Sequence, residues 1–448
     1  MREYFNTGET KTFSFRRQQL KKLRAAILSH EKELHDALHT DLKKSPEESW
    51  VTETGFLINE INHTLKHLQQ WMQPEKVKTN LLNFPSSSFV LKEPLGVVLI
   101  IGPWNYPLQL LFTPLVGAMG AGNCVVLKAS EFAPATGDVM KKIIEENFPS
   151  NYILFTDGDG AEVVPRMMKN FRFDHIFYTG STAVGKVIYK MAAEQLTPVT
   201  LELGGKSPSV VEDDANIKVA ARRISVATFS NAGQMCVAPD YVLVHEHVKE
   251  EFLEALKQAI TQMFSEDPSS DYSYGKIINE KQFNWLVGYL NQGEIVHGGR
   301  NDASKLYIEP TIIENVPLNS PLMTEEIFGP VLPVISFKTF EEAKKIIEQN
   351  PNPLAFYVYS SSNKKQTQWL DAVPAGGACI NNSSWHLTNH YLPFGGRGNS
   401  GMGNYHGENS FETFSHRKAV MKTPTWFDPS IKYPPFKGKL GLFKKVIG

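Results

Sequence analysis

Cys236 is the residue of this chain whose setting best suits a nucleophile. It follows Gly233 and precedes Pro239, so we expect the backbone to turn there and to leave the thiol open to a substrate. The other two cysteines, Cys124 and Cys379, lie in apolar stretches that predict buried strands and inert thiols. Because the thiolate rather than the thiol is the attacking species, Cys236 needs polar partners from elsewhere in the chain.

A carboxylate and an amide could supply what a cysteine nucleophile needs. Glu202 lies between two leucines and ends a β-branched run before two glycines, where partial desolvation would raise its pKa and suit it to activating water. Asn105 lies between two prolines at the end of an apolar run, and an amide on so stiff a loop can donate to an oxyanion. Taken alone, each also fits a plain role, as a surface carboxylate at a strand end or a turn residue.

Five segments along the chain together resemble the motifs of the aldehyde dehydrogenase superfamily, in family order and at family-like spacing. They are residues 102–107 (GPWNYP), 201–206 (LELGGK), 229–238 (FSNAGQMCVA), 325–330 (EEIFGP) and 393–396 (PFGG). The resemblance covers essentially the whole chain. It is closest to the short class 3 or fatty-aldehyde branch, because of the short N-terminus and of residues 238–241 (APDY) and 399–407 (NSGMGNYHG).

The resemblance implies NAD(P)-dependent oxidation of apolar aldehydes, medium- or long-chain or aromatic, to carboxylic acids. Cys236 would attack the carbonyl, its own amide and the Asn105 side chain would hold the oxyanion, and hydride transfer would leave a thioester. Glu202 is the expected base for hydrolysis. Glu326 stays open as an alternative base or as a ligand of the nicotinamide ribose, with Phe328 packed against the ring.

The resemblance also implies a cofactor-binding set. Glu131 matches the family position that grips the adenosine ribose, which favours NAD, although short-branch members use either cofactor and Ala129 replaces a frequent proline. The loop around Gly180 follows a predicted strand and opens a helix, whose amides can attract phosphate. By themselves these segments also read as a strand end and a helix start. The full set is Lys128, Glu131, Gly180, Ser181, Gly185, Glu326 and Phe328.

Two other classes of function remain open. A catalytically silent relative kept for binding or structure is expected to lack the cysteine, the asparagine or the glutamate, and all three are present. A CoA-acylating or reductive enzyme would pass the thioester to CoA or phosphate, or run the chemistry in reverse. Such an enzyme would have no need of Glu202 to activate water.

Composition excludes several partners. The net charge of −1 lacks the basic excess that nucleic acid binding demands. Three cysteines without disulfide spacing predict a reducing, cytoplasmic setting, and no histidine–cysteine cluster has the spacing of a metal site. The N-terminus lacks an apolar signal core. The stretch between Glu93 and Lys128 is uncharged, but its prolines predict a buried strand, loop, helix and strand rather than a membrane span.

The chain is expected to be an α/β protein with two parallel-sheet domains and a β-arm. Residues 1–206 would form a variant Rossmann cofactor domain, 207–391 the catalytic domain, and 392–448 a return segment, an oligomerisation strand and a tail. Helices are predicted at 16–39, 59–71, 108–119, 134–147, 161–169, 250–264 and 340–349, and strands at 96–101, 125–127, 152–155, 174–178 and 331–337.

The ends of the chain suggest contacts with other surfaces. Residues 80–93 would pair with a strand at 411–422 as an arm that binds a second subunit, giving a homodimer. The tail from Lys432 mixes lysines with Leu440, Leu442, Phe443, Val446 and Ile447. It could make weak peripheral contact with an anionic membrane surface, or pack on its own protein or its dimer mate.

Overall fold

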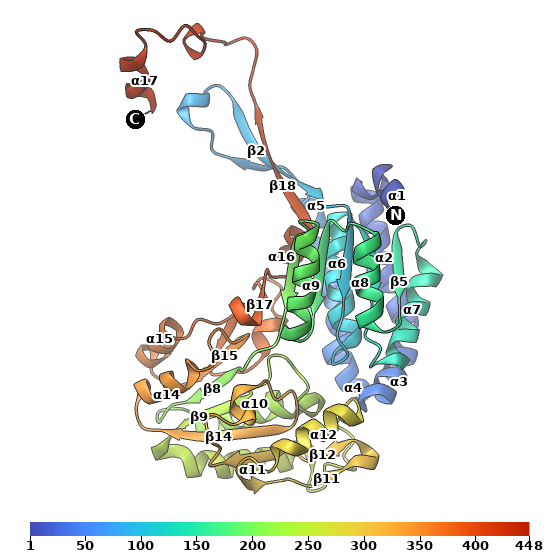
Figure 1. The fold of residues 1–448 in the computed structure, drawn as a ribbon, viewed down its shortest axis with the longest axis vertical. Coiled ribbons are helices and arrows are strands. Elements are labelled where there is room, and N and C mark those ends of the chain that lie inside the picture. The colour runs from blue at the N-terminus through green and yellow to red at the C-terminus, as the bar shows by residue number, and fades with distance from the viewer. Residues whose placement is uncertain (448) are drawn as a thin grey trace.

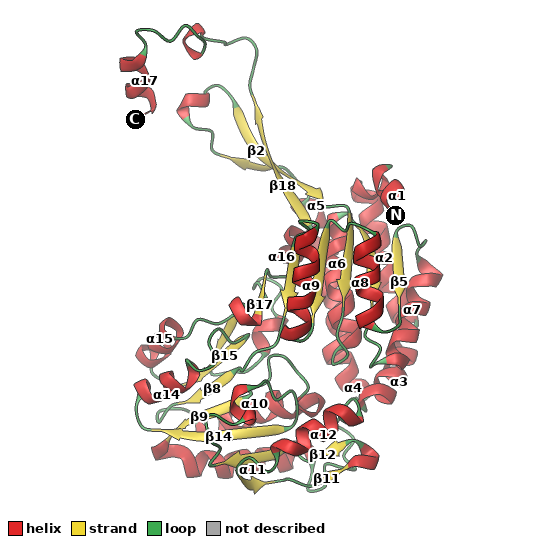
Figure 2. Ribbon diagram, in the orientation of Figure 1, coloured by secondary structure: helices red, strands yellow, loops and turns green. Residues whose placement is uncertain are grey.

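Two parallel sheets organise the chain, and a third, small sheet forms an arm that projects away from them (Figure 1). The structure is a computed structural model that describes residues 1–447. Helices pack around both large sheets (Figure 2), so the expected α/β class with parallel-sheet domains is confirmed. The chain also has short elements outside the three sheets: α1 (Arg2–Asn6), α4 (Pro46–Ser49), β11 (Asn301–Asp302), β12 (Tyr307–Ile308), α13 (Pro321–Thr324) and α17 (Leu440–Ile447).

The first large sheet has the strand order β17-β7-β6-β3-β4-β5. Five of its strands are parallel, and the short β17 joins β7 in the antiparallel direction. Every residue of β3, β4 and β6 is buried, as expected for a parallel sheet covered on both faces. The bounds are β3 (Val97–Ile101), β4 (Cys124–Lys128), β5 (Ile153–Thr156), β6 (His175–Thr179), β7 (Val199–Glu202) and β17 (Gly401–Met402).

Helix α6 (Pro107–Ala121) is the central helix of the first body, and all of its residues are buried. It begins with a proline at its first turn and ends before Gly122, whose φ of 91° suits glycine. The uncharged stretch is therefore strand, loop, helix and strand in a protein core, as predicted. None of the described helices is both long and apolar enough to cross a membrane. Helices α7 (Pro134–Asn147), α8 (Gly160–Asn170) and α9 (Thr182–Glu194) complete the strand–helix alternation.

The N-terminal helix prediction was partly wrong. In place of one exposed helix over 16–39, the chain forms α2 (Phe13–Ser29) and α3 (Glu31–Leu42), which are separated at His30. Helix α2 is also less exposed than its charge density suggested, because Arg16 is buried and donates to the carbonyl oxygens of Thr10 and Gly120. The next long helix, α5 (Gly55–Trp71), starts earlier than residue 59 because the π-helical turn η2 (Trp50–Thr54) leads into it.

The second large sheet has the order β10-β13-β14-β9-β8-β15-β16, and only β10 runs antiparallel to its neighbour. Cys379 on β16 is half-buried rather than buried as predicted, and its Sγ lies 3.4 Å from His386 Nδ1. The strands are β8 (Pro208–Val211), β9 (Tyr241–His245), β10 (Glu294–His297), β13 (Thr311–Glu314), β14 (Val331–Phe337), β15 (Ala355–Tyr359) and β16 (Gly377–Ile380). The helices are α10 (Ile217–Phe229), α11 (Lys249–Phe264), α12 (Glu280–Tyr289), α14 (Phe340–Ile347) and α15 (Asn363–Ala372).

The arm is a three-stranded sheet of β1 (Glu75–Val77), β2 (Ser87–Pro94) and β18 (Ser415–Lys422). Strands β2 and β18 pair antiparallel over eight residues, which confirms the predicted pairing of these distant segments. Both strands start later than predicted. A 3-10 turn occupies residues 81–83, and α16 (Glu408–Thr413) takes up the first residues of the expected second strand.

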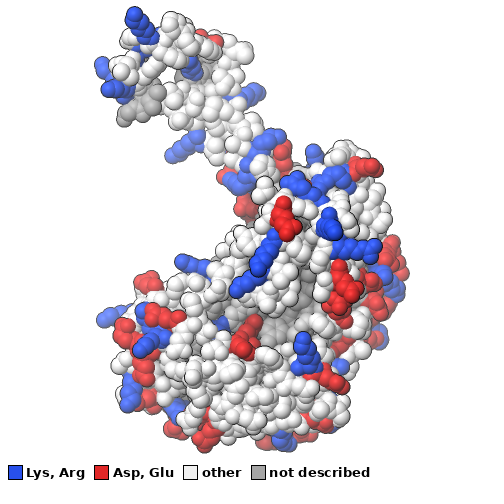
Figure 3. Space-filling model, in the orientation of Figure 1, with Lys and Arg blue, Asp and Glu red and all other residues white. Residues whose placement is uncertain are grey.

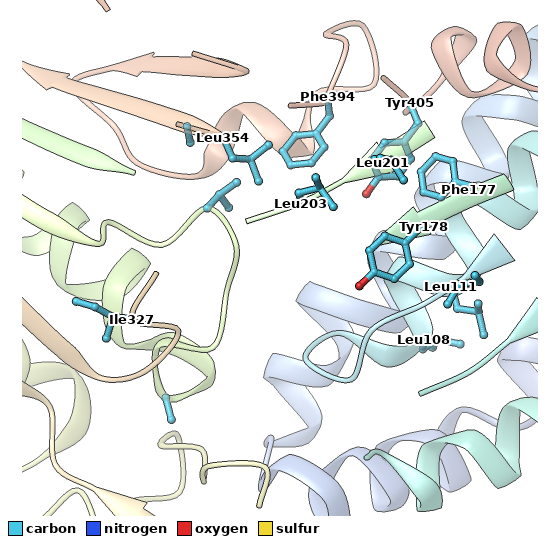
Figure 4. Packing of buried hydrophobic residues seen from close by; sticks show 14 of the residues in the cluster. Leu108, Leu111, Phe177, Tyr178, Leu201, Leu203, Ile327, Leu354, Phe394 and Tyr405 are labelled. Atoms are coloured by element: carbon cyan, nitrogen blue, oxygen red, sulfur yellow. The ribbon is translucent and has the colours of Figure 1, made fainter. Parts of the chain in front are cut away.

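Apolar side chains join the two large bodies next to a pocket. Leu203, Leu354 and Phe394 are buried and line the same pocket, and Figure 4 shows them close together where the two bodies meet. Leu203 follows β7 of the first sheet, whereas Leu354 precedes β15 of the second sheet. This junction is therefore where residues of both bodies can act on one ligand.

Candidate active site

Two pockets approach Cys236 and share part of their walls. The first opens between the two bodies and brings together seven of the ten expected site residues: Asn105, Gly180, Ser181, Glu202, Cys236, Glu326 and Phe328. The second is mainly apolar and runs along residues from the N-terminal helices, α10 and the loop after β16. Both pockets are lined by Leu110, Cys236, Phe394 and Tyr405. A molecule in each pocket would therefore meet the other at the thiol.

The topology explains why these residues converge. Asn105 follows β3, Ser181 follows β6, and Glu202 ends β7, so three neighbouring parallel strands deliver them to one edge of the first sheet. Ligands of open α/β sheets bind at this carboxyl edge. Cys236 comes from the second body, in the loop that connects α10 to the amino end of β9.

The cysteine loop has a strained backbone before the thiol. Asn231 and Ala232 both have a φ of 51°, which is the left-handed region that side chains rarely adopt. Gly233 also has a positive φ, of 74°, and a Cβ there would lie 2.2 Å from the carbonyl oxygen of Gly329. Such strain persists only where surrounding contacts impose it, as they do at active sites.

The half-buried thiol of Cys236 is not ionised by its surroundings alone. Its pKa is raised to about 12, mainly by burial and then by the nearby carboxyls of Glu326 and Glu202, while the backbone amides of Cys236 and Val237 lower it. Those amides donate toward the sulfur, so they are close enough to hold the oxyanion of a carbonyl carbon bonded to that sulfur. The thiol therefore requires a base or a nearby positive charge to react at neutral pH.

Asn105 is held from three sides. Its side-chain Nδ2 donates to the carbonyl oxygen of Gln234 at 3.0 Å, in the cysteine loop. Its own carbonyl oxygen accepts from Lys44 Nζ at 3.1 Å and from Asn231 Nδ2 at 2.9 Å. An amide nitrogen carries two hydrogens, so one N–H of Asn105 remains for a ligand in the first pocket.

Two carboxyl groups line the same pocket as the thiol, and burial raises the pKa of both. Glu202 is only 3% exposed, and neither of its carboxyl oxygens has a hydrogen-bond partner among the described residues. Burial raises its pKa well above the usual value. The pKa of Glu326 is raised to about 8, mainly by burial and then by the charge of Asp240. A hydrogen bond from the amide of Gly205 lowers this pKa in part. Carboxyls with such raised pKa values are candidates for proton transfer near neutral pH.

The first pocket also fits a nicotinamide dinucleotide. Ser181 caps the N-terminus of α9, where backbone amides can attract phosphate, and Glu326 Oε1 is buried without a partner among the described residues, ready to accept from a hydroxyl. Phe328 has a φ of 52°, and its ring packs edge-on against Trp104 with centroids 5.2 Å apart. These residues offer partners for a phosphate, a ribose and a planar ring.

Three of the expected cofactor residues lie outside the lining of this pocket. Lys128 ends β4 at the same sheet edge and donates to Glu131 at 3.2 Å, and Glu131 also accepts from the amide of Gly160 at 3.0 Å. Although burial raises the pKa of Glu131, that amide and Lys128 lower it overall, so the group is a carboxylate. Gly185 permits close packing instead, since a Cβ there would lie 2.6 Å from Leu203 Cδ2.

Phe394 and Tyr405 line both pockets, and no role was predicted for either residue. Their segments, 393–396 and 399–407, contributed to the family resemblance, but nothing local indicates that the chain returns to Cys236 there. The wall residues Val51 and Phe56 were likewise missed. They lie between the helices predicted at 16–39 and 59–71, in a stretch for which no element was predicted.

Comparison with known proteins identifies the family. The model of the aldehyde dehydrogenase family matches residues 1–420. The 4,4'-diaponeurosporen-aldehyde dehydrogenase of Staphylococcus aureus is 44% identical over 98% of this chain and 96% of its own length. The dimeric NADP-preferring aldehyde dehydrogenase of Rattus norvegicus is 42% identical over 98% of this chain and 97% of its own.

A solved structure gives the same result in three dimensions. The substrate-bound state of Staphylococcus aureus AldH superposes with a TM-score of 0.97 at 43% identity, covering 100% of this chain and 98% of that one. The resemblance predicted from the five segments is thus confirmed. The chain belongs to the aldehyde dehydrogenase family, as an oxidoreductase that oxidises aldehydes with NAD or NADP.

Proposed function

We propose that Cys236 is the nucleophile of this enzyme and that the two pockets hold its two substrates, the cofactor in the first and the aldehyde in the second. The observation that carries the proposal is the meeting of both pockets at Cys236. A hydride acceptor and an aldehyde carbon would then lie on opposite sides of one sulfur atom. Such placement supplies much of the rate enhancement through orientation alone.

The first half-reaction forms a bond between Cys236 sulfur and the aldehyde carbon, while the thiol proton passes to a carboxylate of the pocket. The carbonyl electron pair moves to oxygen, where the free N–H of Asn105 and the Cys236 amide donate to it. When bound, NAD(P)+ supplies the chemistry of a hydride acceptor, so that loss of hydride from this carbon leaves a thioester on Cys236.

In the second half-reaction Glu202 takes a proton from water as the water oxygen bonds to the thioester carbon. The carbon–sulfur bond then breaks, the carboxylic acid leaves, and the sulfur regains a proton. Glu202 is preferred to Glu326 because both of its oxygens are free of partners among the described residues, whereas Glu326 also accepts from the Gly205 amide. Glu326 is assigned to the nicotinamide ribose, and Phe328 to the ring.

Apolar aldehydes suit the second pocket. Most of its wall is hydrocarbon or aromatic ring, so a polar chain would lose hydrogen bonds to water on entry, whereas an apolar chain gains from burial. Its apolar lining consists of Val51, Phe56, Tyr106, Leu110, Val226, Ala227, Met235, Val237, Trp385, Leu387, Phe394 and Tyr405.

Either cofactor is expected to be accepted. The Glu131 carboxylate would bond to the ribose hydroxyls of NAD and repel the 2′-phosphate of NADP, but Lys128 neutralises part of its charge. The NADP preference in the name of the rat relative supports keeping both cofactors in the proposal. Residues 1–206 would form the cofactor domain, 207–391 the catalytic domain and 392–448 the return segment, oligomerisation strand and tail.

The arm and the tail are assigned to contacts outside the single chain. The arm would bind a second copy in a cytoplasmic homodimer, as the word dimeric in the name of the rat relative supports. In the tail, Leu440 is 65% and Leu442 is 47% exposed, and lysines follow them in α17. This supports weak peripheral contact with an anionic membrane or docking on the dimer mate.

The test is formation of reduced nicotinamide by the purified enzyme, with NAD and NADP side by side, across aldehydes of increasing chain length. Wild-type kcat/KM should rise with chain length, Cys236→Ser should abolish turnover while cofactor binding persists, and Cys379→Ser should retain activity as the matched thiol control. Turnover by Cys236→Ser would refute the nucleophile. Turnover that appears only when CoA is added would favour acyl transfer over hydrolysis.

A further inference from the structure

Lys44 and Glu53 form an ion pair that is completely buried beside the active site. The side chains are 0% exposed, and Lys44 Nζ lies 2.7 Å from Glu53 Oε1. Removing two charges from water is costly, so a pair of this kind calls for an explanation beyond stability. Lys44 lies in the loop after α3, and Glu53 lies in the π-helical turn η2, a type of turn frequent at functional sites.

Among the described residues, the side-chain hydrogen bonds of this pair outside itself are to the backbone of residues 105–109. Lys44 Nζ donates to the carbonyl oxygen of Asn105 at 3.1 Å and lies 3.8 Å from the ring centroid of Tyr106. Glu53 Oε2 accepts from the backbone amide of Gln109 at 2.8 Å, in the first turn of α6. The pair therefore holds the loop on both sides of the amide that faces the pocket.

The same network reaches the cysteine loop. Asn231 Nδ2 donates to the carbonyl oxygen that Lys44 also contacts, and the Asn231 backbone amide donates to Glu48 at 3.1 Å. The side chain of Asn105 in turn donates to the carbonyl oxygen of Gln234, two residues before the nucleophile. One N-terminal segment thus supports both the oxyanion donor and the loop of the thiol.

We propose that Lys44 and Glu53 are positioning residues that aim the free N–H of Asn105 at the carbonyl oxygen of the substrate bound to Cys236. This inference rests on the proposed role of Asn105. An oxyanion donor contributes only at the right distance, and a displacement of about 1 Å can cost about 100-fold in rate. Val51 and Thr52, in the same turn as Glu53, line the aldehyde pocket, so the pair also fixes that wall.

A double-mutant cycle tests the proposal. In the wild-type background, Lys44→Met/Glu53→Gln, which removes both buried charges together, should lower kcat about 10- to 100-fold with KM nearly unchanged. Asn105→Ala alone should lower kcat about 100- to 1,000-fold. In the Asn105→Ala background the charge-removing pair should cost less than about 3-fold more, because the donor that it positions is already absent.

Controls separate positioning from general damage. Lys365→Met breaks a pair with Glu212 at the opposite end of the second sheet and should leave kcat unchanged. Thermal unfolding and cofactor binding are measured for each variant, and Glu53→Gln alone repeats the cycle if the double variant does not fold. Equal losses of kcat in both backgrounds would overturn the positioning role only. Wild-type kcat in Asn105→Ala would overturn the oxyanion assignment as well.

Discussion

Cys236, Glu202 and Glu326 share one pocket, and burial raises the pKa of all three side chains. Burial in this pocket therefore disfavours three negative charges side by side. A cationic nicotinamide in the first pocket would favour the thiolate, since an opposite charge nearby lowers a thiol pKa. The thiol would then become reactive only when the cofactor is bound. This dependence would protect the cofactor-free enzyme from side reactions at Cys236.

The identity of the base is tested by a matched pair of substitutions. Glu202→Gln should give a burst of one reduced cofactor per site and then stall, with steady-state kcat reduced about 100- to 10,000-fold, because the thioester is no longer hydrolysed. Glu326→Gln should lack the burst-and-stall pattern and raise the KM of the cofactor. Stopped-flow absorbance of the reduced nicotinamide distinguishes them, and the reverse result would move the base role to Glu326.

At the scale of elements, the site is assembled from the carboxyl edge of one sheet and one loop of the other body. Strands β3, β6 and β7 bring their ends together because they are parallel neighbours. The cysteine loop meets that edge only because its backbone takes a left-handed path through residues 231–233. The shape of this loop is therefore as important to the site as the thiol itself.

Gly233→Ala tests the loop. The substitution adds a Cβ at a φ of 74°, only 2.2 Å from the Gly329 carbonyl oxygen, so it should lower the free energy of unfolding by about 1–3 kcal/mol and reduce activity. Gly288→Ala is the matched control, since α12 has open space there, and it should be neutral or stabilising by up to about 1 kcal/mol. Urea denaturation with parallel assays measures both, and equal stability of the two variants would contradict the strain argument.

In the whole molecule, the arm and tail project away from the two bodies (Figure 1), and several of their apolar side chains are exposed. Leu81 is 91%, Phe84 65% and Trp426 76% exposed. Basic side chains are prominent on the same part of the molecule in Figure 3. Exposed apolar surface of this kind marks contact with another surface. Of the tail residues, the side chains of Val446 and Ile447 and all of Gly448 lie outside the described part of the chain.

The oligomeric state provides the test at this scale. By light scattering, the wild type should have twice the chain mass of 50.3 kDa. The variant Leu81→Asp/Phe84→Asp should shift the protein toward the monomer, because burial of each of these side chains at the interface contributes about 1.5–3 kcal/mol. Leu196→Asp, at a residue 84% exposed on the first body, is the control and should remain dimeric. A monomeric wild type at micromolar concentration would refute the dimer.

The alternating strands and helices, the family and seven residues of the first pocket could be predicted from the sequence alone. Apolar runs between glycines and prolines are strong local signals, and the helix over 134–147 and the strand over 331–337 were predicted with their observed bounds. Asn105, Glu202, Cys236 and Glu326 could be predicted because each of them lies in a motif of contiguous residues. Two predictions were wrong. Helix α2 was predicted to be exposed because it has many charged residues, but one of its faces is buried, and α16 occupies the first residues of a predicted strand.

The surroundings of those residues depend on how the chain folds in three dimensions. The return of Phe394 and Tyr405 to the thiol, and the burial of Lys44 against Glu53, depend on contacts between segments that are distant in sequence or lie in ordinary polar stretches. A buried charge carries no local signal, because lysine and glutamate are usually solvated. The motifs therefore predicted which residues react. Packing between distant segments determines the pKa values and orientation of those residues and the lining of the two pockets.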